Sequence, residues 1–164
     1  MNTSPTTNTS DDEDPATLTL QPVAGYLDLM SRGAPAPAAG SAAALAVGMG
    51  AALAGKTARL SAKYRDDTDA LSADADAIRK RAVALADADS HSVATAVPQG
   101  ETTELDMSAV PREIGELAAQ LARLAERLET GGNPWLIADA RSVAFLAQAA
   151  HSMVEAILHS NDEA

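Results

Sequence analysis

The chain has 164 residues, which is enough for one domain of ordinary size. Hydrophobic residues make up 46% of the sequence and aromatic residues only 2%, while alanine, the strongest helix former, occurs 38 times. Because sheet proteins usually rely on aromatic and β-branched residues, this composition disfavours a sheet and predicts an all-α domain.

Charge and cysteine content narrow the class further. A formal net charge of −11 gives the chain no overall attraction to nucleic acid or anionic lipid, so we expect neither as a partner. Without cysteine, the chain has no disulfide, thiolate metal site or cysteine nucleophile, which fits a cytoplasmic protein. The polar, acidic start contains no basic region followed by an apolar one, so we expect no signal peptide.

The first residues differ in composition from the rest. Residues 1–17 are rich in threonine, serine, asparagine and acids without periodicity, which predicts a disordered acidic tail before a helical domain of residues 18–161. That domain opens with a short amphipathic helix. The two prolines of residues 33–37 end it, because proline lacks an amide hydrogen and disfavours helix in the residue before it. Its apolar side holds Val23, Tyr26, Leu27 and Met30.

The second expected helix runs from Ser41 to Tyr64 and consists mostly of alanine and glycine. Residues 34–55 contain no charge, so a membrane span is an alternative. We favour a central helix of a bundle, because the run holds few large apolar residues. Small residues recur along it at helical spacing, which allows close approach of other helices and favours a dimer. They are Ala44, Gly48, Ala51 and Gly55.

Three further helices complete an antiparallel bundle of about five. The third spans residues 66–97 and precedes a loop at 98–108. The fourth shows the clearest helical spacing and ends at the two glycines of residues 131–132. Asn133 caps the fifth, which spans about residues 135–159 and is expected to be buried. The stripe of the fourth helix is Val110, Ile114, Leu117, Leu121, Leu124 and Leu128.

Two acids interrupt the apolar stripes of these helices. Asp89 continues the stripe of Ala82 and Leu85, and Asp139 shares a face with Val143. A carboxylate near an apolar core must find a partner or raise its pKa, which can make it a general base. We expect both side chains to reach one shared polar cavity. The alternatives are that Asp89 faces solvent near a frayed helix end, and that Asp139 pairs with an arginine or stays wet.

Basic residues and a glycine–serine pair mark the two ends of the second helix. Lys56, Arg59 and Lys63 lie at i, i+3 and i+7 and would form one basic stripe, able to receive carboxylates or phosphates. The alternative is a solvated face with favourable charges near a helix C-terminus. Free amides at Gly40-Ser41 could face an anion or a carbonyl, or Ser41 could be an ordinary N-cap.

A histidine-containing stripe raises the question of a metal. His151, Glu155 and His159 follow one another by one helical turn, so two of them could chelate an ion, but including the third would strain the site. The chain contains no recognised zinc signature. We therefore expect a polar helix face and no metal.

Three segments carry a family pattern. They are PAPAAGSAAALAVGMGAALAGKTARLSAKY at residues 35–64, LADADSHSVATAV at 85–97 and GGNPWLIADARSVAFLAQAA at 131–150. In order and spacing they resemble the cyclodeaminase/cyclohydrolase family. This family contains the cyclodeaminase domain of formiminotransferase-cyclodeaminase and the stand-alone methenyltetrahydrofolate cyclohydrolases.

The resemblance implies an all-α domain that usually dimerises and a tetrahydrofolate substrate carrying a one-carbon bridge or formimino group. By position it makes Asp89 and Asp139 the active-site acids. The glycine–serine turn would lie near the pterin, and the three basic residues would meet the anionic glutamate tail. The substrate-binding residues by position are Gly40, Ser41, Lys56, Arg59, Lys63 and Asn133.

The leading function implied by the resemblance is hydrolysis of 5,10-methenyltetrahydrofolate to 10-formyltetrahydrofolate. A carboxylate can stabilise the cationic amidinium of this substrate, orient water toward the bridging carbon and take the water's proton. No cofactor is needed beyond tetrahydrofolate as the carrier. The alternatives are a formimino-tetrahydrofolate cyclodeaminase, an activity that usually accompanies a fused formiminotransferase domain, and a non-catalytic module that binds folate or only dimerises.

Two departures from the family pattern favour the non-catalytic alternative. Relatives have Gly-Gly-Gly-Ser where this chain has Ala-Ala-Gly-Ser at residues 38–41, and added methyl groups could close a backbone approach that glycine permits. The segment between Asp89 and Pro111 is also shorter than in typical members.

Overall fold

Helices account for all the regular structure in the part of the chain that the computed structural model describes, residues 19–33, 36–96 and 107–163. The predicted all-α class is therefore confirmed. The predicted tail of residues 1–17, and most of the predicted loop at 98–108, lie outside the described residues. The elements are α1 (Val23–Ser31), α2 (Ala39–Arg59), α3 (Thr68–Ala96), α4 (Ala109–Glu129), the short 3-10 helix η3 (Pro134–Leu136) and α5 (Ile137–Asp162).

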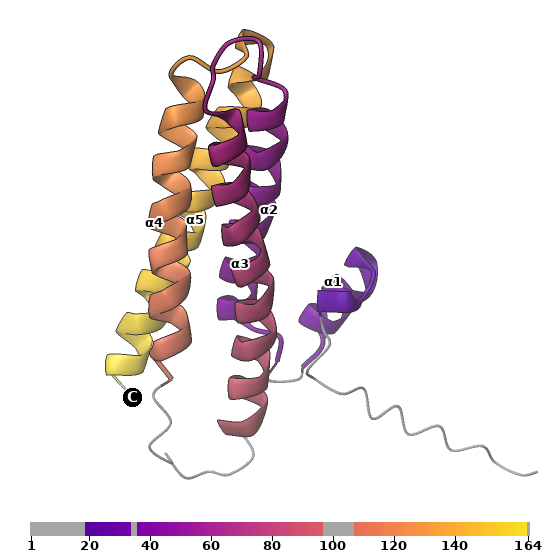
Figure 1. The fold of residues 1–164 in the computed structure, drawn as a ribbon. Coiled ribbons are helices and arrows are strands. Elements are labelled where there is room, and N and C mark those ends of the chain that lie inside the picture. Colours follow the sequence, from indigo (N-terminus) through magenta and orange to yellow (C-terminus); the bar gives the residue numbers. More distant parts are fainter. Residues whose placement is uncertain (1–18, 34–35, 97–106, 164) are drawn as a thin grey trace, which may run out of the picture.

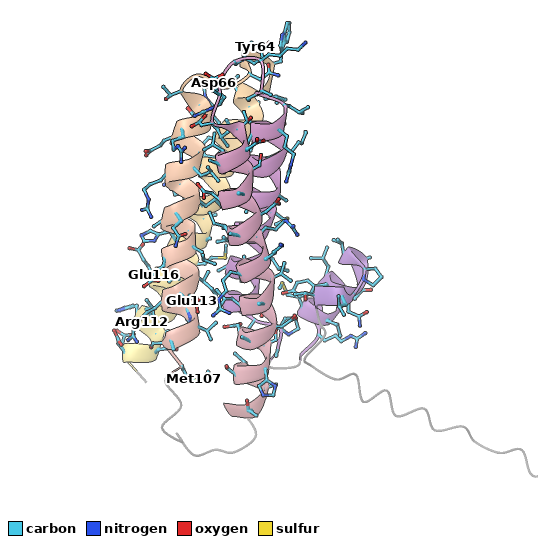
Figure 2. The ribbon with its side chains drawn as sticks, viewed as in Figure 1. Tyr64, Asp66, Met107, Arg112, Glu113 and Glu116 are labelled. Carbon is cyan, nitrogen blue, oxygen red and sulfur yellow. The ribbon has the colours of Figure 1, made fainter. Side chains whose placement is uncertain are left out.

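The four long helices form an up-and-down bundle, and α1 stands beside one end of it (Figure 1). Successive long helices run in opposite directions, and α2 packs against α3, α4 and α5. The turn between α2 and α3, with Tyr64 and Asp66, lies at the opposite end from Met107, where the chain enters α4 (Figure 2). The antiparallel bundle predicted from the sequence is thus present.

Helix α2 is the central helix because its small side chains let its neighbours approach closely. The side chains of Ala43, Ala44, Val47 and Ala54 are completely buried. By length and hydropathy α2 is the one helix in the described residues that could cross a membrane, but 61% of its most apolar window is buried inside the bundle. Its position in the core is sufficient to account for its apolar composition.

The predicted stripe of α4 is the part of the core that the sequence identified best. Ile114, Leu117, Leu121, Leu124 and Leu128 are all buried between α4 and its neighbours. The helix ends at Glu129, and Gly131 follows in the left-handed region with φ of 89°, where glycine is favoured because it has no Cβ.

The second helix is shorter than predicted, ending at Arg59 rather than at Tyr64. After Arg59 the chain enters a tighter turn that contains Ser61. Its amide donates to the Ala58 carbonyl at 2.9 Å, and its hydroxyl accepts from the Asn133 amide at 2.9 Å. Lys63 consequently lies beyond the helix.

The expectation that α5 is buried around its middle is wrong for a single chain. Trp135, just before α5, is 89% exposed and Phe145 is 68% exposed. The helix packs on the bundle mainly through alanine and valine, while Leu146, Met153 and Leu158 are partly buried against the same core. The buried residues of α5 are Ala140, Val143, Ala147, Ala150 and Val154.

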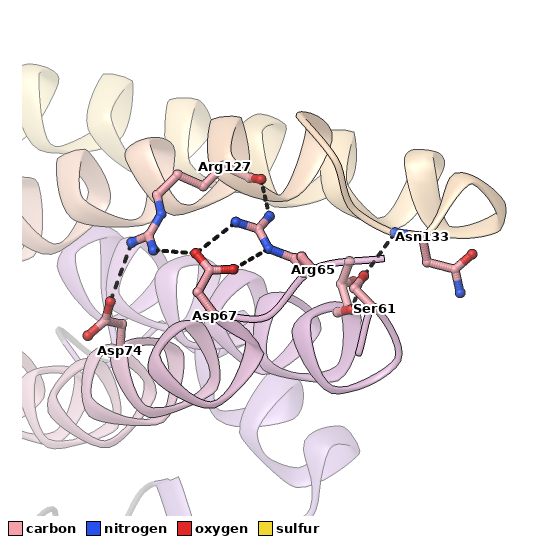
Figure 3. A network of polar contacts seen from close by, with 7 residues as sticks. Ser61, Arg65, Asp67, Asp74, Arg127 and Asn133 are labelled. Atoms are coloured by element: carbon pink, nitrogen blue, oxygen red, sulfur yellow. Dashed lines mark hydrogen bonds and ion pairs between the residues drawn. The ribbon is translucent and has the colours of Figure 1, made fainter. Parts of the chain in front are cut away.

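An ion-pair network ties the turn between α2 and α3 to the end of α4 (Figure 3). Arg65 donates to both carboxylate oxygens of Asp67, at 2.6 and 2.9 Å, and also to the Arg127 carbonyl. The Arg127 guanidinium donates to Asp67 at 3.0 Å and lies 3.7 Å from Asp74. Hydrogen bonding from Arg65, more than any other contact, lowers the pKa of Asp67 to about 2.

Replacing glycine by alanine should have opposite effects on stability at two positions of α2. A Cβ at Gly50 would lie 2.6 Å from Leu121 Cδ2 and 3.3 Å from Leu146 Cβ, whereas a Cβ at Gly48 would meet Ala82 at 3.8 Å, an ordinary contact. We expect Gly48→Ala to raise the free energy of unfolding by about 0.5–1 kcal/mol through helix propensity. Gly50→Ala should lower it by about 1–2 kcal/mol, because a packed core must move. Urea unfolding of both variants measures the difference, and equal effects would contradict the packing described for Gly50.

The Asp67 network predicts a pH dependence of stability. The folded pKa of Asp67, about 2, lies below the ordinary value of 3.8, so its contribution is present above 3.8 and is lost as pH falls toward 2. Asp67→Asn should therefore lower the melting temperature near neutral pH, and the gap from wild type should shrink through this window. Asp66→Asn is the control, since Asp66 makes no ion pair with the described residues. A gap that persists at pH 2 would argue against the network.

Candidate functional site

Asp89 lies buried where α3 crosses the first turn of α2. Its side chain is 6% exposed, and its Oδ2 accepts from the Ser41 amide at 2.8 Å and from the Ser41 hydroxyl at 3.0 Å. Its Oδ1 has no hydrogen-bond partner among the described residues. Because amides at a helix N-terminus point outward and carry positive potential, this is a favourable place for a carboxylate. Asp89 therefore has one oxygen held by Ser41 and one oxygen that makes no hydrogen bond with the described residues.

Gly40 makes this approach possible. A Cβ at Gly40 would lie only 2.0 Å from Asp89 Oδ1 and 2.4 Å from its Cγ, so the carboxyl group occupies the space that a side chain would need. The chain keeps glycine at this position, and the preceding Ala39 is exposed. The alanines of residues 38–41 thus leave the contact with Asp89 intact. The substrate-binding roles predicted for Gly40 and Ser41 stay predictions.

Ser41 contacts several groups of α3 and is not the N-cap of α2. Helix α2 begins at Ala39, two residues earlier, so the N-cap interpretation of Ser41 is wrong. The Ser41 hydroxyl lies 2.7 Å from the hydroxyl of Ser90 and 3.1 Å from the Ala86 carbonyl, and both serines are completely buried. These contacts hold α2 against α3 on the side where Asp89 lies.

Burial has a direct chemical consequence for Asp89. Loss of hydration raises the pKa of its carboxyl group, and the two hydrogen bonds from Ser41 oppose that rise only in part. A carboxylate with a raised pKa is a better proton acceptor than an exposed one, which is what a general base requires. The alternative that Asp89 faces solvent is excluded by its burial.

An apolar cavity of about 300 Å³ lies between α1 and α2, on the side of Asp89. Tyr26 lines it and lies close enough to Asp89 for that carboxylate to influence the tyrosine's pKa. The chain before α1 is fixed to α3 because Thr19 donates to both oxygens of Asp87, at 3.0 and 2.6 Å. The other apolar walls are Val23, Leu27, Met30, Leu45 and Met49.

Asp139 lies near the other end of α2. Its Oδ2 accepts from Lys56 Nζ at 3.1 Å, and its side chain is 32% exposed. Lys56 is about four turns from Ser41, or about 22 Å along the helix. The prediction that Asp89 and Asp139 share a cavity is therefore wrong within one chain. The prediction failed because helical periodicity shows which side chains face the core but not which residues of other helices lie opposite them.

The expected basic stripe is also divided. Lys56 faces Asp139 on α5, and Arg59 donates to Asp76 on α3 at 2.7 Å. Lys63 follows the end of α2 and is exposed. The three cations do not form one helix face, because the helix ends early and acids on two neighbouring helices draw the side chains apart.

Asn133 has a structural role that occupies its side chain. Its Oδ1 accepts from the Trp135 amide at 3.1 Å, which confirms its capping role, although the capped element is η3. Its Nδ2 donates to the Leu60 carbonyl at 3.1 Å. Together with the contact to Ser61, these bonds join the two turns at this end of the bundle.

The histidine stripe of α5 forms simple pairs. His151 lies 3.5 Å from Glu155, and His159 lies 3.3 Å from Glu163. Within the described ranges no group of three histidine or acidic residues is arranged to hold a metal ion.

Tyr26 and Ser90 are the residues near Asp89 that sequence patterns did not single out. In the sequence, Tyr26 fits the apolar face of a short helix, and Ser90 belongs to none of the apolar or charged stripes. Both become functional candidates only through contacts with a different helix.

The fold and this site define a class: an all-α bundle with a buried carboxylate at the start of an alanine–glycine helix. The sequence model of the family described as Formiminotransferase-cyclodeaminase matches residues 22–161. The chain therefore belongs to the formiminotransferase-cyclodeaminase family, and the predicted family is confirmed.

Structural comparison agrees with the family assignment. The crystal structure of formiminotetrahydrofolate cyclodeaminase from Thermotoga maritima matches with a TM-score of 0.82 and 19% sequence identity. The match covers 89% of this chain and 80% of that chain. At this identity the likeness shows the fold. A search of curated proteins found no match.

Proposed function

We propose that this protein is a cytoplasmic enzyme that hydrolyses 5,10-methenyltetrahydrofolate to 10-formyltetrahydrofolate. Membership of the family supports a folate substrate that carries a one-carbon group. The observation that supports hydrolysis is the buried Asp89, with Oδ2 anchored by Ser41 and Oδ1 available. No cofactor beyond tetrahydrofolate as the carrier enters the proposed reaction.

In the proposed reaction, Asp89 first stabilises the cationic amidinium of the substrate by its negative charge. Its Oδ1 then takes a proton from a water molecule while the water oxygen bonds to the bridging carbon. In the resulting neutral tetrahedral centre the bond from the carbon to N5 breaks as N5 takes up a proton and the new hydroxyl group loses one, which leaves the formyl group on N10. The carboxylate then releases its proton to solvent, so one water is consumed and one proton is produced.

A cyclodeaminase is the second candidate, and the structural neighbour favours it, because that protein is a formiminotetrahydrofolate cyclodeaminase. In that reaction N10 would attack the formimino carbon and ammonia would leave. A protonated Asp89 could supply the proton that the leaving ammonia needs, which suits a carboxyl group of raised pKa. Release of ammonia from formimino-tetrahydrofolate distinguishes this activity, and binding without either turnover identifies a folate-binding module.

Asp89→Asn tests the proposed mechanism. Asparagine keeps the shape of the side chain but removes its basicity, so we expect hydrolysis, followed by loss of methenyl absorbance, to fall about 10²-fold or more. The variant should be at least as stable near neutral pH, because ionisation of a group with a raised folded pKa destabilises the fold as pH rises. Asp69→Asn, at the exposed start of α3, is the matched control. If the activity of Asp89→Asn fell only in proportion to the amount of folded protein, Asp89 would be rejected as the base.

A homodimer is proposed from the apolar surface that a single chain leaves open. Met49, at the middle of the outward face of α2, is 59% exposed. Leu45 and Leu53 flank it on the same face, and Phe145 on the adjoining α5 is 68% exposed. Contiguous exposed apolar surface of this kind marks interaction sites, and a second copy presents the same face.

A two-fold axis near Met49 would place the two proposed acids together. Ser41 and Lys56 lie at nearly equal distances on either side of Met49 along α2. If two α2 helices cross antiparallel at Met49, the Asp89 end of one subunit faces the Lys56–Asp139 end of the other. The second subunit would then contribute further candidates for contact with the same substrate, namely Asp139, Lys56 and Arg59. Lys63 and Asn133 would lie beyond them.

Met49→Glu tests this arrangement. In the dimer, the new glutamates of both subunits would be buried next to each other at the proposed axis, which is unfavourable. Light scattering at micromolar concentration should therefore show a 16.8 kDa species for the variant, whereas the wild type should have about twice that mass. Because Met49 also lines the cavity between α1 and α2, the mass is the deciding measurement for this variant. Asp139→Asn should reduce hydrolysis without changing the mass. Gln120→Glu adds the same charge on exposed α4 and should change neither. A monomeric wild type with full activity would exclude the shared site.

A further inference from the structure

The Tyr26 hydroxyl makes no hydrogen bond of normal geometry to the residues that the structure describes, although the Ser41 hydroxyl lies close enough to lower the pKa of Tyr26. Tyr26 is 7% exposed and is the one buried side chain of α1. Its ring lines the cavity between α1 and α2. A buried polar group without a partner is unfavourable and uncommon, so its retention calls for a function.

The surroundings of Tyr26 belong to the site at the start of α2. Ser41 and Asp89 both lie near the hydroxyl, and the Ser41 hydroxyl is already engaged by Asp89, Ser90 and Ala86. Burial is the main cause that raises the pKa of Tyr26; the nearby Ser41 hydroxyl lowers it in part, and the charges of Asp89 and Asp87 raise it further. The hydroxyl therefore keeps its proton and is a donor near neutral pH.

The cavity has the dimensions and character of a ring-binding pocket. Its volume of about 300 Å³ lies at the lower end of the range for small-molecule sites, which suits one flat bicyclic ring rather than an entire folate. Its walls are mainly aliphatic side chains and methionines, which contact the faces of such a ring. The polar groups that line it are those of Thr19, Gln21 and Tyr26.

We propose that the cavity between α1 and α2 binds the flat heterocyclic ring of the substrate, and that the Tyr26 hydroxyl donates a hydrogen bond to the polar edge of that ring. Helix α1 is then a wall of the binding site, and Tyr26 is a contact residue beside the proposed base. Identifying the ring as a reduced pterin rests on the proposed function. The unpartnered hydroxyl and the cavity are independent of it.

Tyr26→Phe is the direct test, with 5-formyltetrahydrofolate as the binding probe in calorimetry on the full chain. We expect the dissociation constant to rise roughly tenfold, the scale of one hydrogen bond. The melting temperature should stay equal or rise, because the variant removes an unsatisfied polar group. Tyr64→Phe is the matched control, since Tyr64 lies at the far end of the bundle (Figure 2) and should change neither quantity.

A second pair of variants tests the cavity itself. Ala42 lines the cavity from α2, and a larger side chain there fills it without weakening helix propensity. We expect Ala42→Leu to reduce binding of the probe at least tenfold while the helical circular dichroism is kept. Ala119→Leu, the same change at an exposed position of α4, should bind as the wild type does.

The outcomes separate this inference from the proposed function. Wild-type hydrolysis with unchanged probe binding in Tyr26→Phe and Ala42→Leu would overturn the inference alone. A lower melting temperature in Tyr26→Phe with unchanged binding would assign the hydroxyl a structural role and overturn it too. Binding that both variants weaken, without hydrolysis above the spontaneous rate, would support the inference and reject the proposed reaction. No binding by the wild type would reject both.

Discussion

The contact between Asp89 and the first turn of α2 is the constraint on which the site depends. A carboxylate can enter this part of the core because three things coincide: a helix N-terminus supplies an amide, Ser41 supplies a hydroxyl, and Gly40 leaves room for the carboxyl group. The same contact orients α3 against α2, and it places Asp89 close enough to influence Tyr26, which lines the cavity between α1 and α2. Packing and chemistry therefore depend on the same few atoms.

Two aspartates show how environment decides the behaviour of one residue type. Asp67 lies at the surface between arginines, and hydrogen bonding from Arg65 lowers its pKa to about 2. Asp89 lies in the core with only Ser41 as a partner, and loss of hydration raises its pKa. The first arrangement favours a permanent charge that ties two turns together. The second favours a group that exchanges its proton, as the proposed hydrolysis requires.

The distribution of side-chain size links the fold to the proposed assembly. The central contacts of α2 are made by alanine and glycine, while Met49, Trp135 and Phe145 point outward. This follows from close helix packing, since small residues let backbones approach and large ones would hold them apart. A second chain covering this surface would bury the larger side chains and would bring both ends of α2 into each site, with α1 at its edge.

The helical class, the family and the buried stripe of α4 could be predicted from the sequence, because hydrophobic periodicity and three ordered segments are properties of the local sequence. The sequence also singled out Asp89, since an acid at a stripe position must meet the core. Only the tertiary structure decided the rest. Helix α2 ends at Arg59, and Ser61 just beyond it contacts Asn133, a residue far along the chain. Asp139 and Asp89 lie at different levels of the bundle, and Tyr26 joins the site through a neighbouring helix. Periodicity shows which side of a helix faces inward, whereas the identity and height of the opposing residues come from how the helices pack together.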